Sequence, residues 1–324
     1  MPLCTIHTVR HGFRQSWITS PHDGSISYPG GASTTITGIP ADVSLTAHGE
    51  TQAQELASYI ASLPPSVRPQ RVYCSPWYRC IQTCKPVVDS LRKGGDDQLG
   101  VLLHPNLGEW FAPTQFEHPR PLAPESMGKF FPNYIDVRAS QSAIASSPGP
   151  QTRSPIPSSY RPEDSTRGGK PEVLGETIAM LHDRVALALE NIIRDCDQDN
   201  ISTILICSHA ATLIAIGRAL TGRLGDLKPP EDLEPDSTPA PSDQDLRWQA
   251  QDFRVFTCSL STFERVNTSL PANHQSIGTM PGRGLHGTAP MQPMWWSGQG
   301  VCGGWRCVRN GETSFLRDGA ERGW

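Results

Sequence analysis

The run ISTILICSHAATLIAIGRAL, residues 201–220, constrains the fold of this chain most strongly. Its first part is almost continuously apolar, which is typical of a parallel strand buried on both faces. Apolar residues then recur at helical spacing. The run therefore predicts a buried strand over residues 204–207 and a helix that begins near His209.

The N-terminal segment predicts a strand that delivers a histidine to a loop. Residues 5–9 alternate in polarity and are rich in β-branched side chains, and the tripeptide RHG follows. In that tripeptide, we expect Gly12 to remove a side chain that would crowd a ligand. A Gly/Ser/Pro-rich surface loop over residues 20–40 then precedes a helical pattern that has Thr46 as its N-cap.

The rest of the chain repeats the alternation of strand and helix. Short strands are predicted over residues 71–74 and 101–103, and a further alternating strand over residues 254–266. Pro76 is expected in the first turn of the helix that follows residue 74, where proline is tolerated. With another helix over residues 176–196, this order predicts a three-layer α/β/α sandwich with a mostly parallel central sheet. Its ligand site is expected at the carboxyl ends of the strands.

Two segments interrupt this pattern. Residues 140–170 are dense in Ser, Pro and Gly, and residues 224–245 are dense in Pro, Asp and Glu. We expect a single domain over residues 1–324 with mobile insertions at both places. The motifs SSPGP and TRSP in the first insertion leave open a role as phosphorylated or partner-binding segments, although tolerated loops are the favoured interpretation.

Composition excludes several classes of protein. A net charge of −4 without a run of Lys or Arg gives no reason to expect direct binding to nucleic acid or to an anionic membrane. No segment approaches the roughly 18 apolar residues of a membrane span, and the N-terminus lacks the pattern of an export signal. The nine cysteines, an odd number without zinc-type spacing, indicate reduced intracellular thiols. The pairs Cys80/Cys84 and Cys302/Cys307 leave a redox or metal role open. We expect a cytoplasmic or nuclear protein.

Three predicted strand ends carry residues suited to phosphoryl chemistry: His11, Arg79 and His209. A neutral imidazole is a good nucleophile toward phosphorus if the phosphoryl oxygens are neutralised by fixed cations. Arg10 and Arg14 flank His11, and Arg79 could add a third planar fork that holds two oxygens at once. The sequence therefore favours His11 as a nucleophile in a phosphate pocket.

A second histidine and an acid complete the candidate set. His209 at a helix N-terminus would favour negative charge on the transferring group. Glu109, in the segment LHPNLGEWF, has an aromatic neighbourhood that could raise its pKa and make it the acid that protonates the leaving oxygen. Taken singly, each of these residues would be an ordinary loop, surface or capping residue, and only the combination indicates chemistry.

Four aromatic residues lie next to these motifs: Trp17, Trp77, Trp110 and Phe111. They could line an aromatic mouth for a leaving group that contains a ring. They could equally belong to the core, which is the favoured interpretation.

The segments RHGFRQSW, SLTAHGETQAQELASYI, CSPWYRCIQT, LGEWF and ICSHAATLIAIGRAL resemble, in order, the motif series of the histidine phosphatase superfamily in its phosphoglycerate-mutase-like branch. The resemblance implies that His11 is phosphorylated, that Arg10, Arg14, Arg79 and His209 bind the phosphate, and that Glu109 donates the proton. It also implies that no metal or organic cofactor is used. Trp17 stands where the mutases have Asn, so mutase activity is not expected.

More narrowly, RHGFRQSW, GEWF, GKFFP and NGETSFL resemble the phosphatase-fold subunit of transcription factor TFIIIC and its stand-alone fungal relatives. Two functions follow as expectations. The first is a phosphomonoester hydrolase acting on a phosphorylated small molecule or phosphoprotein through a phosphohistidine on His11. The alternative is a scaffold subunit, with little or no catalysis, of a TFIIIC-like RNA polymerase III transcription complex, with other subunits of that complex as partners.

Overall fold

The computed structural model describes residues 2–29, 35–95, 97–145, 174–223, 252–266 and 296–323. Within them, six strands form one sheet in the order β5-β4-β6-β1-β7-β8. The first four strands of that order run parallel, and β7 and β8 are antiparallel to their neighbours. The strands span β1 Thr5–Arg10, β4 Arg71–Cys74, β5 Val101–Leu103, β6 Thr203–Ser208, β7 Leu260–Arg265 and β8 Trp305–Glu312.

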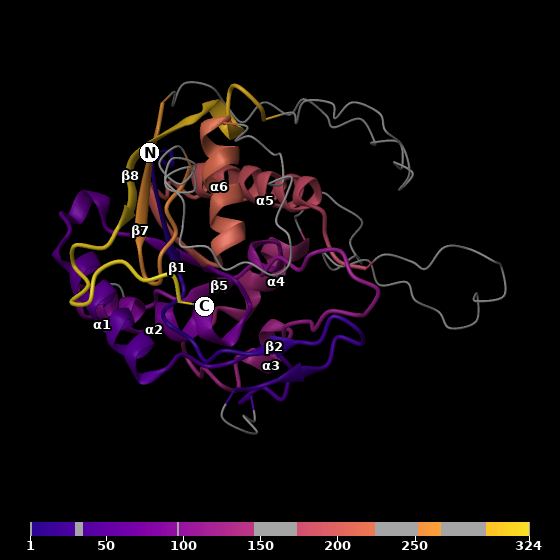
Figure 1. Cartoon of the computed structure of the whole chain (residues 1–324). Helices are drawn as coiled ribbons and strands as arrows, with labels where there is room; N and C mark the ends of the chain where they lie inside the picture. The colour runs from indigo at the N-terminus through magenta and orange to yellow at the C-terminus, as the bar shows by residue number, and fades with distance from the viewer. Residues whose placement is uncertain are drawn as a thin grey trace.

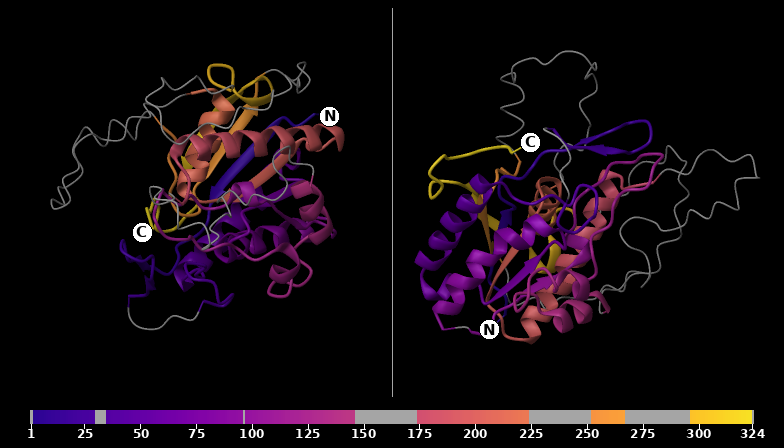
Figure 2. Two further views of the ribbon diagram at one scale, coloured as in Figure 1. Left: turned by 90° about the vertical axis from the view of Figure 1, so that its right-hand side faces the viewer. Right: turned by 90° about the horizontal axis from the view of Figure 1, so that it is seen from below.

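Helices cover both faces of this sheet, which confirms the predicted three-layer sandwich (Figures 1 and 2). Side chains of β6 show why: Ile204 and Ile206 pack into the core cluster beneath α5 and α6, whereas Leu205 and Cys207 pack into the cluster beneath α1 and α2. A strand apolar at successive positions can satisfy both layers at once. The helices span α1 Ala47–Ser62, α2 Tyr78–Lys93, α3 Pro124–Met127, α4 Val137–Ala145, α5 Ile178–Gln198 and α6 Ala210–Thr221, with short 3-10 turns at Pro65–Val67, Pro105–Leu107 and Val301–Gly303.

The helix starts show both a confirmed prediction and a correction. The Thr46 hydroxyl caps α1 by accepting a hydrogen bond of 3.1 Å from the backbone N–H of Gly49. Pro76 does not lie in the first turn of α2, which begins at Tyr78 after Trp77 as N-cap. The indole of Trp77 cannot accept a hydrogen bond, so the buried Asp42 carboxylate accepts instead from the backbone N–H of Tyr78 at 2.8 Å.

The expected insertion at residues 140–170 is partly wrong. Residues 140–145 belong to α4, and the buried Ser140 hydroxyl accepts a hydrogen bond of 2.9 Å from the backbone N–H of Leu103 in β5. Residues 146–170, with the motifs SSPGP and TRSP, lie outside the described residues, as does the second expected insertion at residues 224–245.

Two smaller differences concern strands. The strand expected over residues 254–266 begins only at Leu260, because the chain turns at Cys258, whose φ is 52°. The expected surface loop before α1 includes a two-stranded ribbon of β2 (Ile18–Thr19) and β3 (Ile26–Ser27). Among the described residues, none of the helices is both long enough and apolar enough to span a bilayer.

The RHG loop packs directly against the start of α1. A Cβ atom on Gly12 would lie 2.6 Å from the carbonyl oxygen of Gly49, and a Cβ atom on Gly49 would lie 2.0 Å from the carbonyl oxygen of Phe13. Gly12 thus allows close contact with a helix, whereas the expectation that it also makes room for a ligand stays a prediction. The close packing of this loop on α1 also fixes the position of His11.

We expect Gly49→Ala to lower the free energy of unfolding by about 1–3 kcal/mol, because backbone atoms must move to admit the methyl group. Alanine favours a helix over glycine, so any loss arises despite a gain in helix propensity. Gln54→Ala, an exposed change in the same helix, is the matched control in urea unfolding. A Gly49→Ala protein as stable as the parent would contradict the close packing.

Candidate active site

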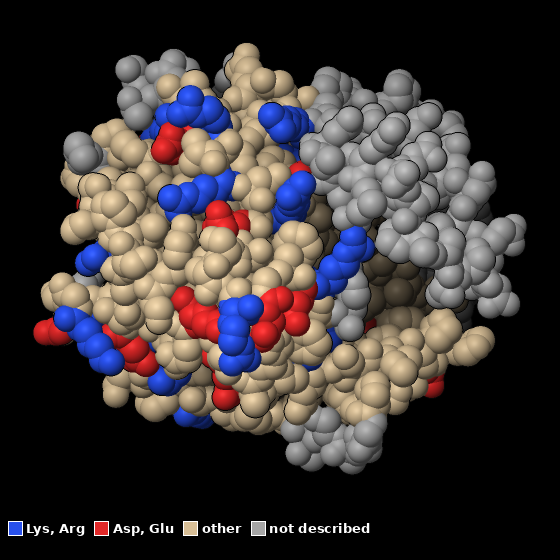
Figure 3. Space-filling model, turned by 60° about the vertical axis from the view of Figure 1, so that its left-hand side comes forward, with Lys and Arg blue, Asp and Glu red and all other residues tan. Residues whose placement is uncertain are grey.

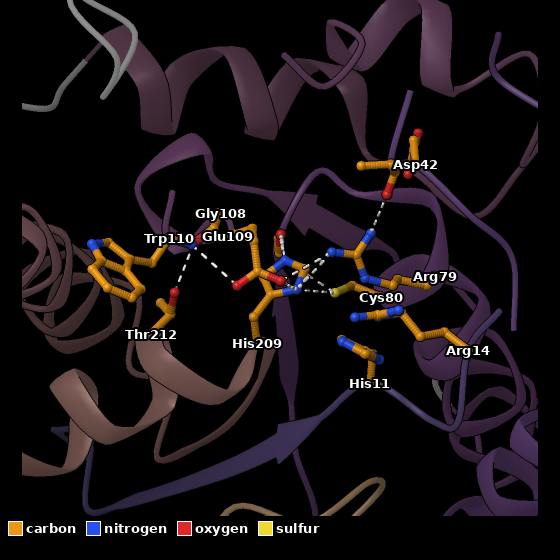
Figure 4. Close-up of polar contacts among 12 residues, drawn as sticks. His11, Arg14, Asp42, Arg79, Cys80, Gly108, Glu109, Trp110, His209 and Thr212 are labelled. Atoms are coloured by element: carbon orange, nitrogen blue, oxygen red, sulfur yellow. Dashed lines mark hydrogen bonds and ion pairs between the residues drawn. The ribbon is translucent and has the colours of Figure 1, made fainter. Parts of the chain in front are cut away.

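The carboxyl ends of three neighbouring parallel strands meet at the candidate site (Figure 4). His11 follows β1, Ser75 follows β4 and His209 follows β6. Because Arg10 pairs with Ser208 in register, the two histidines emerge side by side, with ring centroids 5.3 Å apart. The structure therefore brings together the strand ends that the sequence singled out.

His11 is buried and is held in one orientation. Its Nδ1 atom lies 2.8 Å from the carbonyl oxygen of Gly12, which can only accept a hydrogen bond, so Nδ1 carries the proton and Nε2 keeps a free lone pair. Burial, and then the positive charge of Arg79, lower the pKa of His11 well below its usual value. The ring is consequently neutral near pH 7, as a nucleophile requires.

His209 is the N-cap of α6 and is fully buried. Its Nε2 atom lies 2.7 Å from the hydroxyl oxygen of Ser75, and its Nδ1 atom lies 3.2 Å from a carboxylate oxygen of Glu109. Burial alone would lower the pKa of His209, but the neighbouring Cys80 and Glu109 side chains raise it above its usual value. His209 is therefore protonated more readily than His11.

Arg79 is the cation that links the pocket together. It comes from the first turn of α2 and donates hydrogen bonds of 3.1 Å to the carbonyl oxygen of Ala41 and to Oε2 of Glu109. Its terminal nitrogen also lies 3.2 Å from Nδ1 of His209. Its buried Nε–H has no acceptor among the described residues. A buried donor of this kind is costly to stability unless an anion accepts its hydrogen bond.

Arg14 offers a second buried Nε–H without an acceptor in the described part of the chain. Its guanidinium lies 3.7 Å from the centre of the Trp17 ring, and Figure 4 shows it beside His11 and Arg79. Burial, and then repulsion from Arg79, lower the pKa of Arg14 to about 9. The pocket thus carries surplus positive charge.

Arg10 contacts the far end of the described chain. Its guanidinium donates to the backbone carbonyl oxygens of Arg322 at 2.5 Å, Val255 at 3.3 Å and Gly323 at 3.5 Å. Glu321 anchors the same segment by accepting a 2.7 Å hydrogen bond from the Gln52 amide. Burial lowers the pKa of Arg10 to about 10. These contacts were not expected from the sequence, because 245 to 313 residues separate Arg10 from its partners.

Glu109 lies in the pocket as predicted, but its expected acidity is wrong. Burial would raise the pKa of its carboxyl group, whereas the charges and hydrogen bonds of His209 and Arg79 lower it well below the usual range. The aromatic neighbours in the sequence gave no sign of these two cations. In the empty pocket, Glu109 is a carboxylate.

The Glu109 loop is fixed by buried polar contacts that sequence reasoning missed. The Thr212 hydroxyl donates to the carbonyl oxygen of Gly108 at 2.7 Å, and the Ser208 hydroxyl donates to that of Leu107 at 2.6 Å. Behind the loop, Arg184 forms a buried two-pronged ion pair with Glu176 at 2.6 and 2.7 Å. In the sequence, Glu176 and Arg184 lie eight residues apart on either side of the start of α5, and they look like two ordinary surface charges. Only the adjacency of Ser208 and Thr212 to His209 could have pointed to a supporting role.

The aromatic residues divide between the two roles considered. Trp77 is buried in the core cluster of α1 and α2. Trp17 and Phe111 instead line a cavity of about 490 Å³ between the β2–β3 ribbon and residues 111–119. The cavity borders the pocket, because Trp17 also contacts Arg14 and the carbonyl oxygen of Ala41, another lining residue, accepts from Arg79.

Two groups of described residues combine side chains that metals use as ligands. Three buried thiols, of Cys74, Cys84 and Cys207, lie within 4.8 Å of one another in the core. His11, Glu109 and His209 are equally close, but Arg79 already contacts ligand atoms of Glu109 and His209. A fixed cation at those atoms disfavours a metal ion there. We assign a metal to neither group.

The chain is similar to several known proteins. Residues 6–136 match the model of the histidine phosphatase superfamily (branch 1). Over its whole length the chain is 27% identical to the transcription factor tau 55 kDa subunit of Saccharomyces cerevisiae, and it spans 59% of the length of that protein. It is also 41% identical to the ecdysteroid-phosphate phosphatase of Drosophila melanogaster over 71 residues, which are 22% of this chain and 9% of that protein.

Two solved structures are similar in fold. The ecdysone phosphate phosphatase from Bombix mori in complex with tungstate has a TM-score of 0.44 and 20% identity, with 81% of this chain and 89% of that one covered. A mycobacterial glucosyl-3-phosphoglycerate phosphatase has a TM-score of 0.43 and 12% identity, with 96% and 99% covered.

The different environments of the two histidines predict different titrations. In NMR of histidine-labelled protein, we expect the His11 ring to stay neutral as the pH falls from 7 to roughly 6. We expect the pKa of His209 to lie above the usual value of roughly 6.5, so that His209 takes up its proton at a higher pH than a free histidine. Since the unfolded chain binds a proton at His11 near the usual pKa and the folded chain does not, His11 lowers stability as the pH falls further. The protein in urea is the control, and His11→Gln and His209→Gln assign the signals. Titration of His11 at or above the usual pKa would contradict a neutral His11 ring in the buried pocket.

Proposed function

We propose that this chain, a member of the histidine phosphatase superfamily, is a phosphomonoester hydrolase that forms a phosphohistidine on Nε2 of His11. The observation that carries the proposal is the neutral, oriented His11 ring in a buried pocket of cations. Two unpaired guanidinium N–H groups, on Arg79 and Arg14, are donors for phosphoryl oxygens. Arg10 and His209 complete the proposed phosphate site.

In the first step, the lone pair on Nε2 of His11 attacks phosphorus and the bond from phosphorus to the ester oxygen breaks. That oxygen leaves with the bonding electrons and takes a proton from Glu109. The pocket cations neutralise charge on the three remaining oxygens, which is the main contribution a protein can make to phosphoryl transfer.

Glu109 must first acquire that proton, although His209 and Arg79 hold its pKa well below the usual range. A bound phosphate ester brings negative charge beside the carboxylate and competes for Arg79 and His209. Both effects raise the carboxyl pKa. The proton carried by the substrate monoanion or by solvent can then reside on Glu109.

In the second step, water attacks the phosphohistidine. Glu109, now a carboxylate, accepts a proton from the water, and the phosphorus–nitrogen bond breaks with its electrons returning to Nε2 of His11. Free phosphate leaves, Glu109 releases its proton to the product phosphate or to solvent, and the starting state is restored. These steps need neither a metal ion nor an organic cofactor.

We infer that the substrate is a phosphorylated small molecule or phosphoprotein, and that nucleic acid is not bound directly. The similar protein from Drosophila melanogaster is named as a phosphatase, which supports the first inference. On the face drawn in Figure 3, basic and acidic side chains are interspersed, which disfavours a polyanion. Support for the second inference is thus electrostatic.

The test is acid-labile phosphoenzyme trapping with an aryl phosphate. We expect the parent protein to form a phosphoenzyme that is lost in acid, and His11→Ala to form none and to lose roughly 10⁴-fold or more in turnover. His182→Asn, which alters a buried histidine of α5 outside the pocket, is the matched control. Equal turnover by a folded His11→Ala protein would refute the nucleophile.

A second candidate function is that of a scaffold subunit in a TFIIIC-like RNA polymerase III transcription complex, which implies a nuclear location. The observation that favours it is similarity along the whole chain to the yeast tau 55 kDa subunit. A preserved fold can serve docking even where catalysis is weak. The two functions are compatible, because the phosphate pocket is internal and docking uses the outer surface.

For the scaffold, we expect the endogenous tagged chain to co-purify with stoichiometric partner subunits from nuclear extract. His11→Ala should retain them, because the substitution is buried and leaves the surface unchanged. Quantitative mass spectrometry of the purified material measures both. Recovery of the chain as a monomer from gentle extracts would count against this function.

A further inference from the structure

We propose that the cavity beside the phosphate pocket binds the leaving group of the substrate, and that this leaving group is a large, uncharged ring system. We call it the leaving-group cavity; it lies between the β2–β3 ribbon and residues 111–119. The inference rests on the proposed function, because it concerns the part of the phosphate ester that departs from phosphorus.

The position of the cavity supports this role. Trp17 lines it and also places its ring 3.7 Å from the Arg14 guanidinium. Phe111, another lining residue, follows Glu109 by two positions, so the wall begins next to the proposed proton donor. An ester oxygen near Glu109 would therefore have its organic group at the cavity entrance.

The size of the cavity excludes a small leaving group as its best occupant. Its volume of about 490 Å³ lies within the range of pockets for drug-sized ligands, roughly 300–1,000 Å³. A cavity that encloses benzene needs only about 150 Å³. A leaving group of three or four carbon atoms would leave most of the apolar wall in contact with water.

The chemistry of the wall favours rings without charge. Phe111 stacks on His118 with ring centres 4.8 Å apart. Phe116 contacts the same His118 ring edge-on, with ring centres 5.4 Å apart. Burial lowers the pKa of His118, so its ring is neutral near pH 7. Flat apolar surfaces of this kind bind aromatic or alicyclic rings by stacking and burial.

Charge argues in the same direction. Among the described lining residues there is no Lys, Arg or Asp, and Glu117 is the one glutamate. A leaving group with a carboxylate or second phosphate would lose water without gaining a cation. Arg120 lies beside the cavity but is already paired with Glu117 at 3.1 Å, and the buried cations Arg14 and Arg79 lie in the phosphate pocket.

The test compares three alkyl phosphates whose leaving alcohols have similar acidity: 2-(2-naphthyl)ethyl, n-butyl and 3-carboxypropyl phosphate. Matching the alcohols keeps the intrinsic reactivity of the esters nearly equal, so differences report binding in the cavity. We expect kcat/KM for the naphthylethyl ester to exceed that for the butyl ester by about 10- to 100-fold. The carboxypropyl ester should fall below the butyl ester.

Two variants locate the effect. Phe116→Ala should lower kcat/KM for the naphthylethyl ester by about 10-fold while leaving the butyl ester within about twofold. The exposed Phe130→Ala, outside the cavity, is the matched control. Because Phe116 packs closely on Gly24, the exposed Gln115→Lys provides a second test that leaves this packing intact. Its added cation should raise kcat/KM for the carboxypropyl ester several-fold.

The outcomes separate the two proposals. Equal kcat/KM for the three esters, a preference for the carboxypropyl ester, or an equal loss on both neutral esters in Phe116→Ala overturns the leaving-group cavity and leaves the phosphatase standing. Absence of turnover and of trapped phosphohistidine with every ester overturns the phosphatase, and the cavity assignment with it. A naphthyl preference that Phe116→Ala removes supports both.

Discussion

The parallel pairing of β1 with β6 is the constraint on which the site depends. Because Arg10 pairs with Ser208, the next residue of each strand is a histidine, and both leave the sheet at the same edge. The pairing of Cys74 with Cys207 brings the start of α2, and so Arg79, to that edge. A shift of β1 by one residue would send the side chains of that strand to the opposite face and separate His11 from His209.

The pocket holds more positive than negative charge. One carboxylate, Glu109, faces the protonation-prone His209 and the arginines Arg79 and Arg14, and this excess of cations is costly in a buried place. Burial and the same excess of cations keep His11 neutral, and the cations attract an incoming phosphate dianion. The excess of buried cations therefore lowers the stability of the protein while it raises the affinity for phosphate.

Much of the fold and the positions of the site residues could be predicted from the sequence, since strand ends and apolar runs are local features. The acidity of Glu109 could not, because it depends on His209, 100 residues away, and on Arg79. Nor could the cap that Asp42 gives to α2, because it joins elements far apart in the chain. The helix at residues 140–145 was missed since its composition is polar, and packing of Ser140 under β5 decides its structure.

The order of strands in the sheet has a consequence for synthesis of the chain. The segment that matches the family model, residues 6–136, contains β1, β4 and β5, yet β1 and β4 are separated in the sheet by β6, residues 203–208. A ribosome-bound chain thus carries β1 with both edges unpaired until some 200 residues have emerged. Such delayed, non-local pairing slows folding and leaves apolar strands open to association, so β1 is the element most in need of protection by a chaperone.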